Sequence, residues 1–203
     1  MKRFMLIFSF LYCSFIAFPQ EFQKDMEAFR ESIQLEKDGE YADAAAILKK
    51  SYKKDSYEYN LRLGWLDYLS GQYTESTTFY QKALTLKPMS IEARNGIVYP
   101  LIALGKTNEA SKIYLEILDI SPNETNANYR LGLIYYQQQK YKEAEKHLNR
   151  IINIYPFDYD TLVLLAWNYF QMGKSNEAKI LFQKALLFKP NDESATQGLK
   201  LVN

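Results

Sequence analysis

The residue types that carry most enzyme chemistry are scarce in this chain. His147 is its only histidine, and Cys13 is its only cysteine. A Cys/His metal cluster or a histidine-based catalytic triad cannot be built within one chain from so few such residues. We therefore expect no enzyme activity, no bound metal and no cofactor. We expect His147 to be a surface residue on the outer side of a helix.

Two short segments look like the end of a phosphate-binding loop, Gly105-Lys106-Thr107 and Gly173-Lys174-Ser175. That motif requires a glycine five residues before its second glycine, and it requires a preceding strand. Pro100 and Asn168 stand where the first glycine would be, and no strand is predicted. These segments are better explained as turns that recur along the chain, which argues against nucleotide binding.

The turns belong to a repeat of 34 residues. Four prolines keep this spacing, and so do three glycines, with Gln139 where a fourth glycine would fall: Pro88, Pro122, Pro156 and Pro190; Gly71, Gly105 and Gly173. A period of this length indicates stacked supersecondary units. Within each unit, apolar residues recur at helical spacing twice, on either side of the turn. Each unit is therefore predicted to be a pair of helices, and Asn123, Asp158 and Asn191 are expected to cap the helices that follow.

The repeat resembles the tetratricopeptide repeat. The best copy carries the resemblance through Leu131-Gly132, Tyr135, Tyr141, Ala144, Leu148 and Pro156. The resemblance implies an all-α fold, a right-handed α-solenoid of stacked antiparallel helix pairs that usually binds other proteins on its concave side. The sequence departs from the family where bulky aromatic residues are usual, at Asn60, Arg94, Asn128 and Leu162. We expect Arg94 to pair with Asp67, which also replaces an aromatic residue.

Residues 1–20 resemble a secretory signal peptide. Lys2 and Arg3 precede an apolar run from Phe4 to Phe18, which is shorter than an ordinary membrane span. The alternative is an uncleaved anchor. Tyr12, directly before Cys13, is larger than the residue that a lipoprotein signal requires. The formal net charge of +1 gives no basic field for nucleic acid.

The rest of the chain, residues 21–203, is predicted to be one repeat domain. Residues 21–24 form a polar joint, and a degenerate repeat spans residues 25–56. Four full repeats follow at 57–90, 91–124, 125–158 and 159–192, and residues 193–203 form a capping helix.

Counting by the period places one residue near the middle of each first helix on the concave side. These residues are Trp65, Tyr99, Leu133 and Trp167. Large rings at three of the four places favour a binding surface, because tryptophan, tyrosine and arginine dominate binding hot spots. The alternative is that the rings fill gaps between neighbouring helices. The flanking residues of the predicted groove are Arg62, Tyr68, Asn95, Tyr129, Arg130, Tyr136 and Phe170.

The sequence thus favours an exported, extracytoplasmic scaffold without enzyme activity that binds a protein segment in an aromatic-lined groove. Two alternatives remain open. One is a membrane-tethered component of an envelope complex, held by an uncleaved leader. The other is a carbohydrate-binding module, since aromatic faces also stack on sugars.

Overall fold

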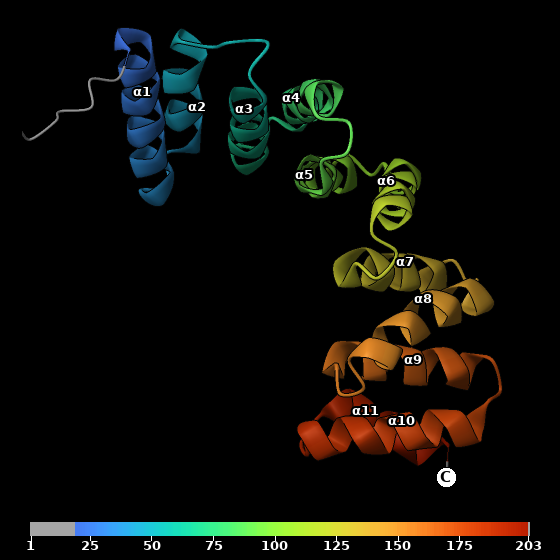
Figure 1. The fold of residues 1–203 in the computed structure, drawn as a ribbon. Helices are drawn as coiled ribbons and strands as arrows, with labels where there is room; N and C mark the ends of the chain where they lie inside the picture. The colour runs from blue at the N-terminus through green and yellow to red at the C-terminus, as the bar shows by residue number, and fades with distance from the viewer. Residues whose placement is uncertain (1–18, 203) are drawn as a thin grey trace, which may run out of the picture. The chain divides into compact units, whose positions relative to one another are not determined.

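A computed structural model of the chain describes residues 19–202, and these residues form eleven α-helices and no strand (Figure 1). The predicted all-α fold of paired helices is confirmed. The chain divides into two compact units, Met1–Tyr52 and Lys53–Asn203, and each is described by itself. The predicted leader at residues 1–18 lies outside the described residues.

The first unit contains the helix pair α1 (Gln20–Lys37) and α2 (Tyr41–Lys50). Ala44, Ala45 and Leu48 of α2 are buried. The predicted polar joint at residues 21–24 was wrong, because α1 already begins at Gln20. Glu21 lies in the first turn of α1, where a negative charge interacts favourably with the helix dipole.

The second unit stacks nine helices, and each packs against the next along the chain. They are α3 (Tyr57–Leu69), α4 (Tyr73–Leu86), α5 (Ile91–Ala103), α6 (Thr107–Ile120), α7 (Thr125–Gln137), α8 (Tyr141–Ile154), α9 (Tyr159–Gln171), α10 (Ser175–Phe188) and α11 (Glu193–Leu201). The odd-numbered helices also touch one another: α3 contacts α5, and α9 contacts both α7 and α11. These odd-numbered helices are the first helices of the repeats, and they carry all the residues of the predicted groove.

The first helices begin at an identical place in the 34-residue period because each is capped in the same way. A side-chain oxygen of the residue before the helix accepts a hydrogen bond from the backbone N–H three residues later. The five capping residues are Ser56, Ser90, Glu124, Asp158 and Asp192. Of the predicted caps, Asp158 is confirmed. Asn123 and Asn191 were wrong, because each lies one residue before the position from which a side chain reaches the third N–H.

The turn inside each pair requires a backbone that glycine adopts easily. Gly39, Gly71, Gly105 and Gly173 have φ between +73° and +82°, and Gln139 adopts φ +58° at the equivalent place. The Gln139 turn keeps the same backbone bonds, with the Lys140 N–H donating to the Tyr135 carbonyl at 2.8 Å. A side chain in this left-handed region costs about 1–2 kcal/mol, so one of the five turns is strained.

Candidate functional site

The four residues predicted at the middle of the groove occupy equivalent places on their helices. Trp65 lies on α3, Tyr99 on α5, Leu133 on α7 and Trp167 on α9, and each is the ninth residue of its helix. Because the caps fix where each helix begins, the helix period directs these four side chains toward the same face. Their surroundings nevertheless differ between the two ends of the second unit.

Three aromatic rings gather at the α3–α5 end. The Trp65 ring lies 5.7 Å from Tyr68 and 6.4 Å from Tyr99, measured between ring centroids, and Tyr68 lies 5.5 Å from Tyr99. Tyr73 of α4 extends this group, at 5.9 Å from Tyr68. Trp65 packs against the buried core that includes Tyr80 and Ile97, whereas Tyr99 keeps 44% of its surface exposed. We call Trp65, Tyr68 and Tyr99 the aromatic triad.

Trp167 is engaged in packing at the other end. Its indole Nε1 donates a hydrogen bond to Ser194 Oγ of α11 at 2.9 Å. Its ring meets Phe170 at 5.7 Å and the fully buried Phe182 at 5.1 Å, both edge to face. These contacts join α9 to α10 and to the last helix, which is the gap-filling role that the sequence left open.

The apolar and aromatic residues of the predicted groove on α7 are also half-buried. Leu133, Tyr129 and Tyr136 pack against the core cluster of the last two repeats. Burial raises the pKa of the Tyr129 and Tyr136 hydroxyls, and Tyr136 meets Tyr141 edge to face at 5.8 Å. This part of the face offers less exposed aromatic surface than the aromatic triad.

The polar residues at the edge of the face differ in their engagement. Arg130 is exposed, and its Nε donates to Asn126 Oδ1 at 3.4 Å. Arg62 is half-buried. Asn95 is half-buried too, and its Oδ1 has no hydrogen-bond partner within residues 19–202. A buried acceptor without a partner is costly, so Asn95 marks a spot on α5 where a donor would be favoured.

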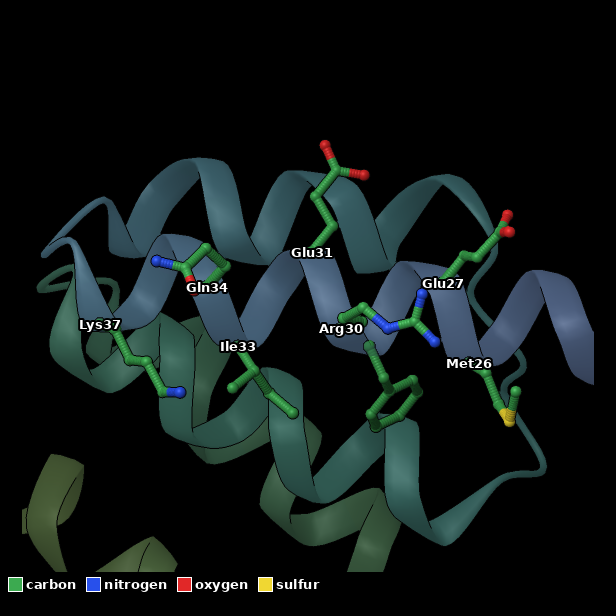
Figure 2. A pocket seen from close by; sticks show the side chains of 8 residues that line it. Met26, Glu27, Arg30, Glu31, Ile33, Gln34 and Lys37 are labelled. Carbon is green, nitrogen blue, oxygen red and sulfur yellow. The ribbon is translucent and has the colours of Figure 1, made fainter.

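The first unit presents a separate hollow of about 720 Å³ on α1. Figure 2 shows Met26, Ile33 and Lys37 projecting along one side of the helix, with Glu27 and Glu31 on the other. Counting back from Gly71 to Gly39 makes Ile33 equivalent to Trp65 in the repeat. The hollow of α1 therefore includes the place of a first helix that Trp65 holds in the aromatic triad, but its lining has a single aromatic residue, Phe29, among aliphatic, polar and charged ones.

Sequence reasoning missed a polar link that recurs behind this face. The fourth residue of three first helices reaches back to backbone carbonyls of the preceding loop. Asn60 Nδ2 donates to Lys54 O at 2.9 Å, Arg94 Nη1 to Pro88 O at 2.5 Å, and Asn128 Nδ2 to Pro122 O at 3.1 Å. These are the places where the family favours an aromatic residue, so hydrogen bonds replace ring packing here. The expected Arg94–Asp67 pair was wrong, because the Arg94 Nε binds Glu116 at 3.0 Å.

His147 also belongs behind the face, which corrects the prediction that it lies on the surface. It is only 9% exposed, and its Nδ1 lies 3.1 Å from Asn128 Oδ1. Its ring stacks on Tyr135 at 5.6 Å. The 34-residue period could have indicated this burial, because the residues equivalent to His147 are all apolar: Phe79, Ile113 and Leu181.

No group of three or more His, Cys, Asp or Glu side chains within residues 19–202 is arranged to hold a metal ion. Within the same range, no helix combines the length and apolar character needed to cross a membrane.

Comparison with known proteins agrees with the fold. Two family models described as tetratricopeptide repeat match residues 57–88 and residues 123–187. No curated protein sequence matches the chain. A crystal structure of a tetratricopeptide repeat protein from Parabacteroides merdae is 23% identical, with a TM-score of 0.77, and the match covers 89% of this chain and 72% of that one.

Two further structures are similar over nearly their whole lengths. YrrB, described as a TPR protein with an unusual peptide-binding site, is 16% identical with a TM-score of 0.72, covering 90% of this chain and 98% of that one. MamA AMB-1 is 20% identical with a TM-score of 0.71, covering 85% and 95%. At these identities the likeness concerns the fold.

Proposed function

Because this chain is a tetratricopeptide repeat protein, we propose that it is a non-enzymatic scaffold that binds a segment of another protein. The binding face consists of the first helices of the second unit, and the aromatic triad is its anchor. The observation that carries this proposal is the exposed ring of Tyr99 beside Trp65 and Tyr68. A peptide-binding site described for YrrB, which has a similar fold, supports it.

The physical argument rests on the combination of support and exposure. Trp65 is fixed by the core beneath it, so little side-chain entropy is lost when a ligand packs on the triad. Tyr68 and Tyr99 add hydroxyl groups that hydrogen-bond a peptide backbone while their rings cover apolar side chains. Arg62 lies on the same helix as Trp65 and Tyr68 and adds a guanidinium donor at the edge.

A matched pair of variants tests the site. A photo-crosslinking amino acid placed at Tyr99 should capture a protein segment, whereas the same amino acid at Tyr155 should not. Tyr155 is a comparable control because it is an exposed tyrosine, in the loop that follows α8.

The captured segment can then be titrated against variants by fluorescence anisotropy. We expect Tyr99→Ala to weaken binding by at least about 2 kcal/mol, roughly 30-fold in Kd, with an unchanged melting temperature. Tyr155→Ala should bind like the wild type. Equal losses for both variants, or no loss for Tyr99→Ala, would show that the triad is not the anchor.

We further propose that the scaffold works outside the cytoplasm, with residues 1–20 directing export. The support is the sequence of the leader, Lys2-Arg3 followed by an uncharged apolar run. Mass spectrometry of the mature N-terminus after cell fractionation tests this: cleavage near residue 20 fits an exported scaffold, and an intact leader in the membrane fraction fits a tethered one. A glycan array probed with wild type and Tyr99→Ala distinguishes a carbohydrate ligand from a peptide.

A further inference from the structure

The buried histidine links three segments of the second unit. Asn128 Nδ2 donates to the carbonyls of Pro122 and Glu124, so Asn128 Oδ1 is the acceptor in its contact with His147. Neutral His147 therefore carries its proton on Nδ1. Through this chain of bonds, α8 is connected to α7 and to the loop between α6 and α7.

The repeat fold itself does not require this link. One repeat later, the residues equivalent to Asn128 and His147 are Leu162 and Leu181, and both are buried in an apolar contact region. One and two repeats earlier, the place of His147 is held by Ile113 and Phe79. The histidine thus brings a titratable group to a position that is otherwise apolar.

The charged groups around the imidazole do not favour a positive charge there. Lys146 and Arg150 flank it on α8, and Arg150 Nη1 donates to Pro122 O at 3.0 Å. Tyr135 and Asn128 face it from α7. The side chains of these two residues are neutral.

The nearby carboxylates on the neighbouring elements either have other partners or are exposed to solvent. Glu124 accepts from the Ala127 N–H at the start of α7, and Glu145 is held by Lys174 at 2.9 Å. Glu143, one turn before His147, is exposed. From α9, Tyr169 reaches α8 at Asn149. Burial is the main cause that lowers the pKa of His147, and the positive charges of Lys146 and Arg150 add to it. Together they lower this pKa to about 4.

We propose that the His147–Asn128 contact is an acid-sensitive joint, at which protonation of His147 opens the α7–α8 pair before the rest of the second unit. Protonation adds a positive charge next to two cationic residues, at a side chain that is only 9% exposed and so poorly solvated. Because α7 carries Leu133 and Tyr136, opening also removes part of the binding face; that consequence rests on the proposed function, whereas the joint itself does not.

Hydrogen exchange measured by mass spectrometry tests the joint without any partner. Protection factors, corrected for the intrinsic pH dependence of exchange, are compared at about pH 7 and about pH 5. In the wild type, peptides from residues 125–154 should lose roughly tenfold more protection than peptides from residues 57–86. The double variant Asn128→Leu/His147→Leu introduces the leucines that the next repeat has at the equivalent places, Leu162 and Leu181, and should show no such difference. A uniform loss across the second unit, or the same local loss in the variant, overturns the proposal.

Two measurements keep the test decisive if the double variant does not fold. His147→Phe introduces the residue found at the equivalent Phe79 and should also abolish the local pH effect. Since His147 is the only histidine, its imidazole gives a single set of NMR signals in the untagged protein. Titration of these signals near the ordinary histidine pKa, while the protein stays folded, would refute the joint.

Discussion

Replacing Gly96 with alanine tests how the second unit packs large side chains against small ones. A Cβ atom at Gly96 would lie 2.2 Å from Tyr80 Cε1 and 2.4 Å from Tyr80 Cζ. Normal carbon–carbon contacts are about 3.5–4.0 Å, so the methyl group is more than about 1 Å too close. The Tyr80 ring is buried and lies between Gly96 and Gly64, so we expect it to have little room to move away from the added methyl group.

The expected cost follows from two opposing effects. Overpacking a rigid ring costs about 1–3 kcal/mol, and alanine regains up to about 1 kcal/mol of helix propensity. We expect a net loss of about 1–2 kcal/mol in the free energy of unfolding. For a unit of this size, that corresponds to a fall of roughly 2–8 °C in the melting temperature. Urea denaturation followed by circular dichroism measures the first quantity, and calorimetry measures the second.

A second substitution identifies the cause. Two repeats later, Leu148 occupies the place of Tyr80, and Leu164 stands where Gly96 would be, so the shorter leucine leaves room for a side chain. Tyr80→Leu should therefore reduce the cost of Gly96→Ala, with a coupling energy of about 1 kcal/mol or more in a double-mutant cycle. If Gly96→Ala is as stable as the wild type, or if the two changes are additive, the steric explanation fails.

Three further predictions follow from other parts of the second unit. Gln139→Gly should raise the free energy of unfolding by up to about 1 kcal/mol, because it relieves the left-handed backbone; a decrease in urea denaturation would contradict this. Leu131→Ala should lower it by about 2–5 kcal/mol, because Leu131 is fully buried; a change under about 0.5 kcal/mol would disprove its role in the core. The folded state holds His147 neutral down to about pH 4, whereas the unfolded chain takes up a proton near pH 6.5. The contribution of neutral His147 to the free energy of unfolding is therefore fully present above pH 6.5. Roughly 3 kcal/mol of this free energy should be lost as the pH falls to about 4. His147→Leu should remove this pH dependence of the free energy of unfolding, as measured by urea denaturation at several pH values.

The period predicted the helix pairs and their turns well, because both depend on spacing. Even Gln139 was placed in the turn, where it takes the backbone of the missing glycine. The caps were harder, because several residues with suitable side chains stand in a row. In Asn123-Glu124-Thr125, composition favours asparagine, yet Glu124 caps α7 because it is the residue directly before the helix. Side-chain preferences for the capping position do not distinguish between two adjacent residues that can both accept the hydrogen bond.

The interior polar contacts were the least predictable. The expected Arg94–Asp67 pair assumed that a buried carboxylate attracts the nearest cation in the sequence pattern. Arg94 instead follows Asn60 and Asn128 in binding the loop carbonyls, and its Nε lies beside Glu116 of α6. Long side chains choose among several partners, and that choice depends on geometry that spacing does not encode. His147 differs, since the apolar residues at the equivalent places, Phe79 and Leu181, were a signal of burial that the surface prediction did not use.

The two tryptophans show why equivalence within a repeat does not establish a binding role. Trp65 and Trp167 share a position, but their environments are set by the next first helix. After Trp65 comes Tyr99, whose ring stays exposed and widens the aromatic surface; after Trp167 comes α11, whose Ser194 holds the indole N–H. The two substitutions should therefore separate. Trp167→Ala should release α11 and lower the melting temperature. Trp65→Ala should mainly weaken the binding of the captured segment, with a smaller effect on the melting temperature. The reverse order would move the proposed anchor from the α3–α5 end to the C-terminal repeats.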